Sequence, residues 1–166
     1  EIQKGKGTNA MAIETAGRLG TATSVDALIA ALSTDYKAEA TAALLAFNGN
    51  INERVTTALK TATGDLQLAL LDIANTRRIK SASPQVFELI NSSDATVAAA
   101  ALKALPGVVT KDNATQLAGM MDKASGEKAA IYQQAFTASI KGMNAEEQYK
   151  VISSEIQKAS NKARFY

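Results

Sequence analysis

Apolar residues recur at helical spacing along nearly the whole chain, and this periodicity limits the possible folds more than any other feature. Val25, Leu28, Ile29 and Leu32 show the i, i+3, i+4, i+7 pattern, whereas no period-2 strand pattern persists. Similar stripes follow within 40–47, 51–62, 66–73, 86–90, 97–105, 114–121, 132–143 and 149–156. Pro106-Gly107 is expected to end the helix before it. The sequence therefore predicts an all-α protein of about nine or ten helices.

Helix-start signals fall between these stripes. Asn50-x-x-Glu53 and Asn144-x-x-Glu147 have capping-box spacing, with Asn in place of Ser or Thr. The first helices of successive pairs are expected to begin near residues 24, 51, 84, 111 and 145, a spacing of roughly 27 to 34 residues. This is the length of a helical hairpin with short links. Hairpins of this size cannot bury both faces alone, so we expect them to stack.

The tetrapeptide Glu-Ile-Gln-Lys occurs twice, at residues 1–4 and 155–158. Each copy precedes a polar segment, at 5–9 and 159–162, which is expected to link it to a new helix. Both ends therefore lie at a similar phase of one repeat, as in a solenoid. We expect one domain over 1–166, with repeats near 1–20, 24–49, 50–80, 84–107, 111–143 and 144–166. Because neither end has the polar cap of a terminal repeat, we expect an interior slice of a longer protein; a natural end with a frayed tail is the alternative.

Composition argues against several functional classes. The 18 basic and 16 acidic residues give a net charge of +2, far from the concentrated positive surface of a nucleic-acid-binding protein. No apolar stretch approaches the roughly 18 residues of a membrane span. The lack of Cys and His removes Cys-His and Ser-His nucleophiles and most zinc, copper and haem ligands. We therefore expect no nucleic-acid partner, no membrane span, no metal and no cofactor.

Three segments carry a family resemblance. Residues 16–32, which include Ala-Gly-Arg-Leu-Gly followed by Val-Asp-Ala-Leu-Ile-Ala-Ala-Leu, resemble a HEAT-like repeat of the variety named after phycobilisome lyases. Residues 39–47 and 97–105 resemble two more Ala-rich second helices of that family. The resemblance covers essentially the whole chain. It implies a right-handed α-α superhelix of stacked antiparallel helix pairs, and it says little about function.

In HEAT-like solenoids the second helices line the concave face, which is the usual binding surface, so the resemblance places candidate binding residues there. Taking Ala40, Ala43, Leu44 and Phe47 as core, the opposite side of that helix and its equivalents give Thr41, Leu45, Gln67, Leu71, Lys103, Gln134, Thr137 and Lys141. Such a row could bind an extended peptide or a helix. Leu45 and Leu71 have a second interpretation, in which they pack against neighbouring repeats.

Other candidate sites are weaker. The basic segment 77–80 could contact phosphate or an acidic partner, or it could lie at a helix end where positive charge suits the dipole. Gly5-Lys6-Gly7-Thr8 lacks phosphate-loop spacing and is expected to be a linker. The matches to the glycosylation sequon at 91–93 and 113–115 are expected by chance in a chain rich in Asn, Ser and Thr. The carboxylates form no pair on one helix face beside an apolar pocket; they include Glu14, Glu39, Asp72 and Glu88.

These observations predict a non-catalytic scaffold that binds a protein or peptide, or that positions neighbouring domains of a longer chain. The alternative is an accessory module of a larger, extracytoplasmic carbohydrate-active enzyme whose chemistry lies outside this segment. Richness in Thr, Ala, Asn, Gln and Lys is compatible with export, which slightly favours an extracytoplasmic over a cytoplasmic location.

Overall fold

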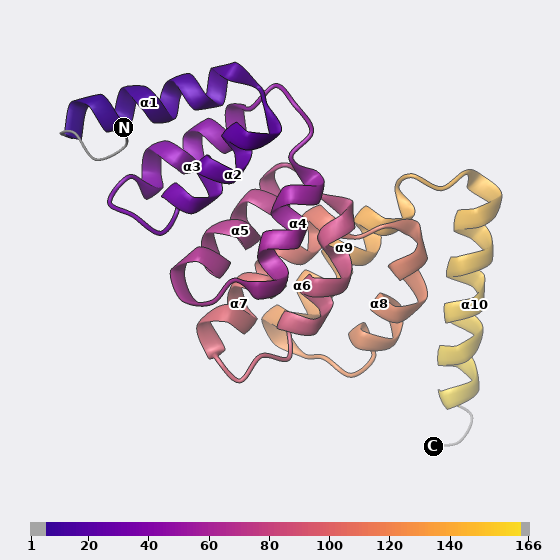
Figure 1. Ribbon diagram of the computed structural model, residues 1–166. Helices are drawn as coiled ribbons and strands as arrows, with labels where there is room; N and C mark the ends of the chain where they lie inside the picture. The colour runs from indigo at the N-terminus through magenta and orange to yellow at the C-terminus, as the bar shows by residue number, and fades with distance from the viewer. Residues whose placement is uncertain (1–5, 164–166) are drawn as a thin grey trace.

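The computed structural model describes the backbone of residues 6–163 and the side chains of residues 9–158. Within these limits the protein is all-helical and has no strand, as the periodicity predicts (Figure 1). The α-helices are α1 (Lys6–Leu19), α2 (Ala22–Ala31), α3 (Lys37–Ala46), α4 (Asn52–Thr61), α5 (Gly64–Thr76), α6 (Ser83–Leu89), α7 (Ala95–Val108), α8 (Ala114–Met121), α9 (Gly126–Ile140) and α10 (Ala145–Ala163). Two short 3₁₀ helices, η1 (Lys80–Ala82) and η2 (Lys111–Asn113), precede α6 and α8.

The odd-numbered helices form a row. Helices α1, α3, α5, α7 and α9 each contact the next member of this set. The even-numbered helices pack beside them, with α2 against α1 and α3, α4 against α5, α6 against α7, and α8 against α9. Helices α1 and α10 lie at opposite ends of the molecule (Figure 1). The helices expected as the first members of the hairpins are thus the even-numbered ones, and those expected as the second members are the odd-numbered ones.

One continuous core joins the helices from α1 to α9. Its buried members extend in sequence from Ile13 to Ala135, and most of them are Ala, Leu, Ile and Val. Leu44 and Leu70 are fully buried, as is Leu105 on the next helix of the row. Burying a leucine side chain contributes roughly 2 kcal/mol, so these three residues stabilise the packing of α3, α5 and α7 in the row. No described side chain of α10 belongs to this core.

The observed helix starts confirm the expected spacing, although the capping differs in detail. Helices α2, α4, α6 and α10 begin within two residues of the predicted positions, and η2 leads into α8. The expected box at Asn144 and Glu147 forms, whereas at α4 the Asn50 side chain instead accepts from the N–H of Asn52 at 2.9 Å. That bond joins residues just before and at the start of α4, and Glu53 does not take part in it.

Pro106-Gly107 does not end α7, which continues to Val108. Gly107 serves close packing instead. A Cβ atom at this position would lie 2.3 Å from Oδ1 and 2.5 Å from the carbonyl oxygen of Asn75 on α5. The C-terminal turns of α5 and α7 can approach this closely only because residue 107 has no side chain.

The two predicted polar links are also corrected. Residues 6–9 form the first turn of α1, and residues 159–162 continue α10 without a break. The second helix expected to begin near residue 161 therefore does not begin within the described chain. The Glu-Ile-Gln-Lys copy at 155–158 lies inside α10, while the copy at 1–4 and Gly5 lie outside the described residues.

Candidate binding surface

Seven of the eight predicted site residues lie on the odd-numbered helices α3, α5, α7 and α9, and Lys141 immediately follows α9. Lys103, Gln134, Thr137 and Lys141 are exposed; Thr41, Leu45 and Gln67 are half-buried. Leu71 is only 1% exposed and belongs to the core. Its side chain is therefore not part of an exposed row, and the packing interpretation is correct for this residue. Leu45 also packs partly against the core.

Two of these residues meet in a groove between α5 and α7, here called the central groove. It has a volume of about 230 Å³, with Leu71 at its apolar floor and the exposed Lys103 and Asp72 in its lining. The remaining lining residues are Leu68, Asn75, Thr96, Ala100 and Ala104. A groove that combines an apolar floor with charged side chains can hold one side chain of a partner and orient its polar groups.

Two other predicted residues meet in a second groove, here called the basic groove, which adjoins the first. Gln134 and Lys141 line it together with Arg78 and Lys80, and its volume is about 420 Å³. Its other lining residues are Asn75, Thr76, Pro106, Gly107 and Ala138. Asn75 lines both grooves, so they adjoin at this residue of α5. Thr41, Leu45, Gln67 and Thr137 line neither.

The basic segment 77–80 is built into helix ends, but not in the way that its place in the sequence suggests. Arg77 donates to the carbonyl oxygens of Leu45, Phe47 and Gly49 at 2.9, 2.8 and 3.1 Å, in the last turn of α3 and just after it. Lys80 donates to those of Gly107 and Val109 at 2.9 and 2.7 Å, at the end of α7. Both cations therefore satisfy carbonyl groups at the negative ends of neighbouring helices. The segment does not lie in the last turn of its own helix, since α5 ends at Thr76; Arg77 and Lys80 instead bind the ends of the neighbouring helices α3 and α7.

Arg78 differs from Arg77 and Lys80. It occupies the left-handed position after α5, with φ of 54°, and closes the turn with hydrogen bonds from its N–H to Asn75 and from Ile79 N–H to Ala74. Glycine is the usual residue here, because a Cβ atom at positive φ costs about 1 kcal/mol. The Arg78 side chain is exposed and lines the basic groove. Burial lowers the pKa of the Lys80 ammonium, and the nearby charge of Arg78 lowers that pKa further.

A larger groove between α1 and α3 was missed by the sequence reasoning. It has a volume of about 540 Å³ and is lined mainly by small apolar residues, among them Ala10, Ala42, Ala43 and Ala46. A Cβ atom at Gly17 would lie 3.1 Å from Cβ of Ala43, so the two helices pack closely below it. The signal for this groove was present in the sequence as the many alanines of both helices, together with Gly17 in α1.

The structure brings two of the four candidate carboxylates, Glu14 and Glu39, to one groove and separates the other two. Glu14 and Glu39 line the α1–α3 groove, Asp72 lines the central groove, and Glu88 lies on α6. All four are exposed, and Glu14 bonds to Arg18 at 2.7 Å. General acid catalysis by a carboxylic acid usually needs a more buried setting. The described part of the chain also contains no group of three Asp or Glu side chains placed to hold a metal ion.

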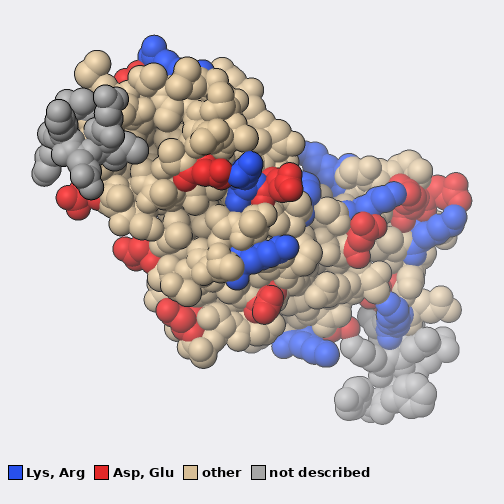
Figure 2. Space-filling view, viewed as in Figure 1, with Lys and Arg blue, Asp and Glu red and all other residues tan. Residues whose placement is uncertain are grey.

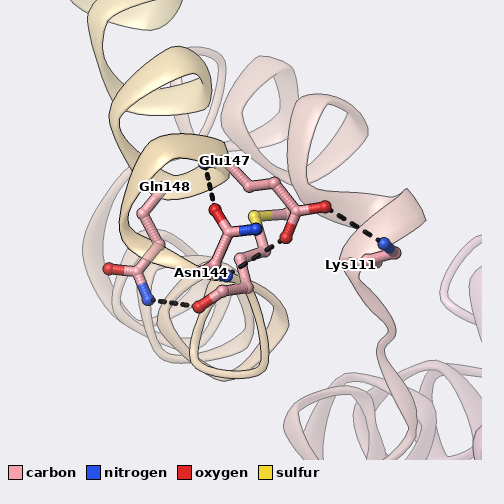
Figure 3. Close-up of polar contacts among 5 residues, drawn as sticks. Lys111, Asn144, Glu147 and Gln148 are labelled. Atoms are coloured by element: carbon pink, nitrogen blue, oxygen red, sulfur yellow. Dashed lines mark hydrogen bonds and ion pairs between the residues drawn. The ribbon is translucent and has the colours of Figure 1, made fainter.

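Helix α10 is fixed at its first turn (Figure 3). Glu147 Oε2 accepts from the N–H of Asn144 at 3.1 Å, and Asn144 Oδ1 accepts from the N–H of Glu147 at 2.9 Å. Lys111 reaches Glu147 Oε1 at 3.3 Å, and Gln148 donates to the carbonyl oxygens of Ile140 and Met143. Bonding to the Asn144 N–H lowers the pKa of the Glu147 carboxyl, and Lys111 lowers it further.

Beyond this turn, α10 leaves its apolar side uncovered. Tyr149, Ile152 and Ile156 are 72%, 39% and 64% exposed. The sequence pattern predicts these residues as a complete packing stripe, but α10 makes its main contact with α8 alone and stands apart from the other helices (Figure 1). No described helix is both long and apolar enough to cross a membrane.

Charged residues of both signs are interspersed over the face shown in Figure 2, with no large area of one sign. This matches the small net charge of the chain. No protein-family model, no curated protein and no solved structure matches the chain.

Proposed function

We propose that the protein is a non-catalytic helical-repeat scaffold of the HEAT-like kind, which binds a protein or peptide segment across its odd-numbered helices. The observation that carries this proposal is the pair of grooves joined at Asn75. Together they bring the exposed Lys103, Gln134 and Lys141 into two adjoining grooves, with the almost fully buried Leu71 at the base of the central groove.

The order of the helices supports the same proposal. Each odd-numbered helix contacts the next, and the first helices of the pairs begin at nearly constant intervals. Stacked pairs of this kind produce an extended surface on which each repeat adds contacts. A superhelix with its second helices on the concave face would place both grooves on its inner side. An extended segment suits this surface, because the grooves have small volumes and follow one another.

The central groove offers a direct test. Ala100 lines it from α7, and arginine there would fill its apolar floor; Ala99 is the next residue, is exposed and does not line the groove. Peptides would be selected from a random display library on the unmodified protein, and their dissociation constants measured by fluorescence anisotropy. We expect Ala100→Arg to raise the dissociation constants of the selected peptides by about tenfold or more, which corresponds to a loss of about 1.4 kcal/mol of binding free energy.

Ala99→Arg is the matched control, because it adds the same charge and side chain one position away. It should leave the dissociation constants within about twofold of the unmodified value. Circular dichroism of both variants checks that the helices are retained. If the Ala100→Arg variant bound the peptides as tightly as the unmodified protein, the peptide site would lie elsewhere and the proposed surface would be contradicted.

A further inference from the structure

The basic groove has an excess of positive charge that the described structure does not neutralise. Arg78, Lys80 and Lys141 line it, and no carboxylate does. An adjoining hollow of about 490 Å³ shares Arg78 and Lys80 and adds Lys60, with Glu53 as its single carboxylate. Within the part of the chain that the structure describes, Arg78, Lys141 and Lys60 make no side-chain hydrogen bond and no ion pair. Lys80 is already bonded to two carbonyl oxygens.

The backbone at Arg78 gives an independent reason to assign this side chain a role. A left-handed residue after a helix is normally glycine, which adopts positive φ without strain. Arginine provides nothing that this turn needs, because both closing hydrogen bonds come from backbone groups. Its side chain instead adds a second positive charge beside Lys80, and this charge lowers the pKa of Lys80. Strained positions with such charge are typical of binding sites.

The surroundings favour a protein segment over a nucleic acid. The amide groups of Asn75 and Gln134 line the groove and can bond to a peptide main chain. The central groove next to it is lined by the apolar side chains of Leu68 and Leu71, which suit an apolar side chain of a peptide. Among the side chains that the structure describes, no aromatic one that could stack on a base lines either groove.

We infer that the basic groove binds the carboxylates of an acidic peptide segment through Arg78 and Lys141, while an apolar side chain of the same segment occupies the central groove. This inference rests on the proposed function and names the class of partner. The guanidinium of Arg78 can bind a carboxylate with two hydrogen bonds, and Lys141, just after α9, supplies a second positive charge to the same groove. Asn75, which lines both grooves, lies where the two parts of the segment meet.

The probe is a short fluorescent peptide with leucines followed by a run of glutamates, and its matched control has glutamines in place of the glutamates. Anisotropy titrations at low salt should show binding of the glutamate peptide, at least about tenfold tighter than the glutamine peptide. The affinity should fall as salt is raised, because the contact is between charges. Equal binding of the two peptides would overturn the inference.

Arg78→Gly is the decisive variant, because its two expected effects have opposite signs. Glycine adopts the positive φ without strain, so the melting temperature should rise. Loss of the guanidinium should raise the dissociation constant of the glutamate peptide by about tenfold. Lys141→Ala should weaken binding by about threefold or more, and Lys128→Ala, an exposed lysine of α9 outside the groove, should leave it unchanged. Unchanged binding by the Arg78→Gly variant would overturn the inference.

Two further outcomes separate this inference from the proposed function. If peptide binding were weakened by Ala100→Arg but showed no preference for acidic residues, the inference would be overturned and the scaffold proposal would stand. A single-stranded oligonucleotide that displaces the glutamate peptide at lower concentration than the unlabelled peptide itself would overturn it in favour of nucleic-acid binding.

Discussion

Helices α7 and α10 both carry an apolar stripe at helical spacing, but α7 is largely apolar and Ala-rich whereas α10 is mostly polar, and the two stripes have opposite surroundings. The apolar stripe of α7 is covered by α5, α6 and α9, and its residues Val97, Ala101 and Leu105 are buried. The stripe of α10 at Tyr149, Ile152 and Ile156 is exposed, and this helix is held by the contacts of its first turn. Periodicity therefore identifies the apolar face of each helix, whereas only the neighbours decide how much stability that face contributes.

The largest expected difference between the two helices comes from removing a large apolar side chain. Leu105→Ala should lower the free energy of unfolding by roughly 2–5 kcal/mol, because Leu105 is fully buried and its removal leaves a cavity. In a chain of this size, that corresponds to a fall in melting temperature on the order of 10 °C. Thermal unfolding followed by circular dichroism measures it. A fall of less than about 2 °C would mean that α7 is not packed as described.

The close approach of α7 to α5 gives the next largest effect. Gly107→Ala should destabilise the protein by roughly 1–3 kcal/mol, because the added methyl group would meet the backbone of Asn75. Gly119→Ala in α8 is the matched control. A Cβ atom there meets nothing within 4 Å, so alanine should stabilise the helix by about 0.5–1 kcal/mol. Urea denaturation of both variants should give changes of opposite sign; two changes of the same sign would contradict the packing at Gly107.

The sequence predicted the helical class and most helix starts because these depend on local signals. The box at Asn144 and Glu147 is an example, since its two bonds join residues three apart. For Leu71 the sequence left two interpretations open, an exposed row or packing against neighbouring repeats, because one helix taken alone shows only one apolar face. Helix α5 packs against α3, α4 and α7, so its buried arc is wider and takes in Leu70 and Leu71 together.

The candidate surface was predicted only in part, for a similar reason. The sequence placed Lys103 and Lys141 on a common face, but it could not show that Arg78 and Lys80 join Lys141 in one groove. Lys80 is positioned by bonds to carbonyl groups 27 and 29 residues away, and Arg77 by bonds across 28 to 32 residues. Such contacts depend on how the pairs stack, and no local pattern encodes them.

The attachment of α10 should depend on pH in a way that the buried core of α7 does not. The folded pKa of Glu147 lies below its ordinary value of 4.5, so its carboxylate stabilises the start of α10 above that pH. This stabilisation should be lost as the pH falls through the folded pKa, when protonation weakens the bonds to Asn144 and Lys111. The Cα chemical shifts of the first turn of α10 would report the loss. In a Glu147→Gln variant the same shifts should no longer change over this pH range; an unaltered pH dependence would contradict the assignment to Glu147.

The smallest effect is expected from the exposed stripe of α10, and it tests the comparison most directly. Ile156→Ala removes a branched apolar side chain of the same size as that of Leu105, but from a position that is 64% exposed. Because little apolar surface returns to water, the free energy of unfolding should change by less than about 0.5 kcal/mol, and alanine's higher helix propensity could make the change favourable. A loss as large as that of Leu105→Ala, measured in the same urea titration, would mean that α10 folds back onto the other helices in solution. The stripe would then contribute to the core, and the difference between α7 and α10 would not hold.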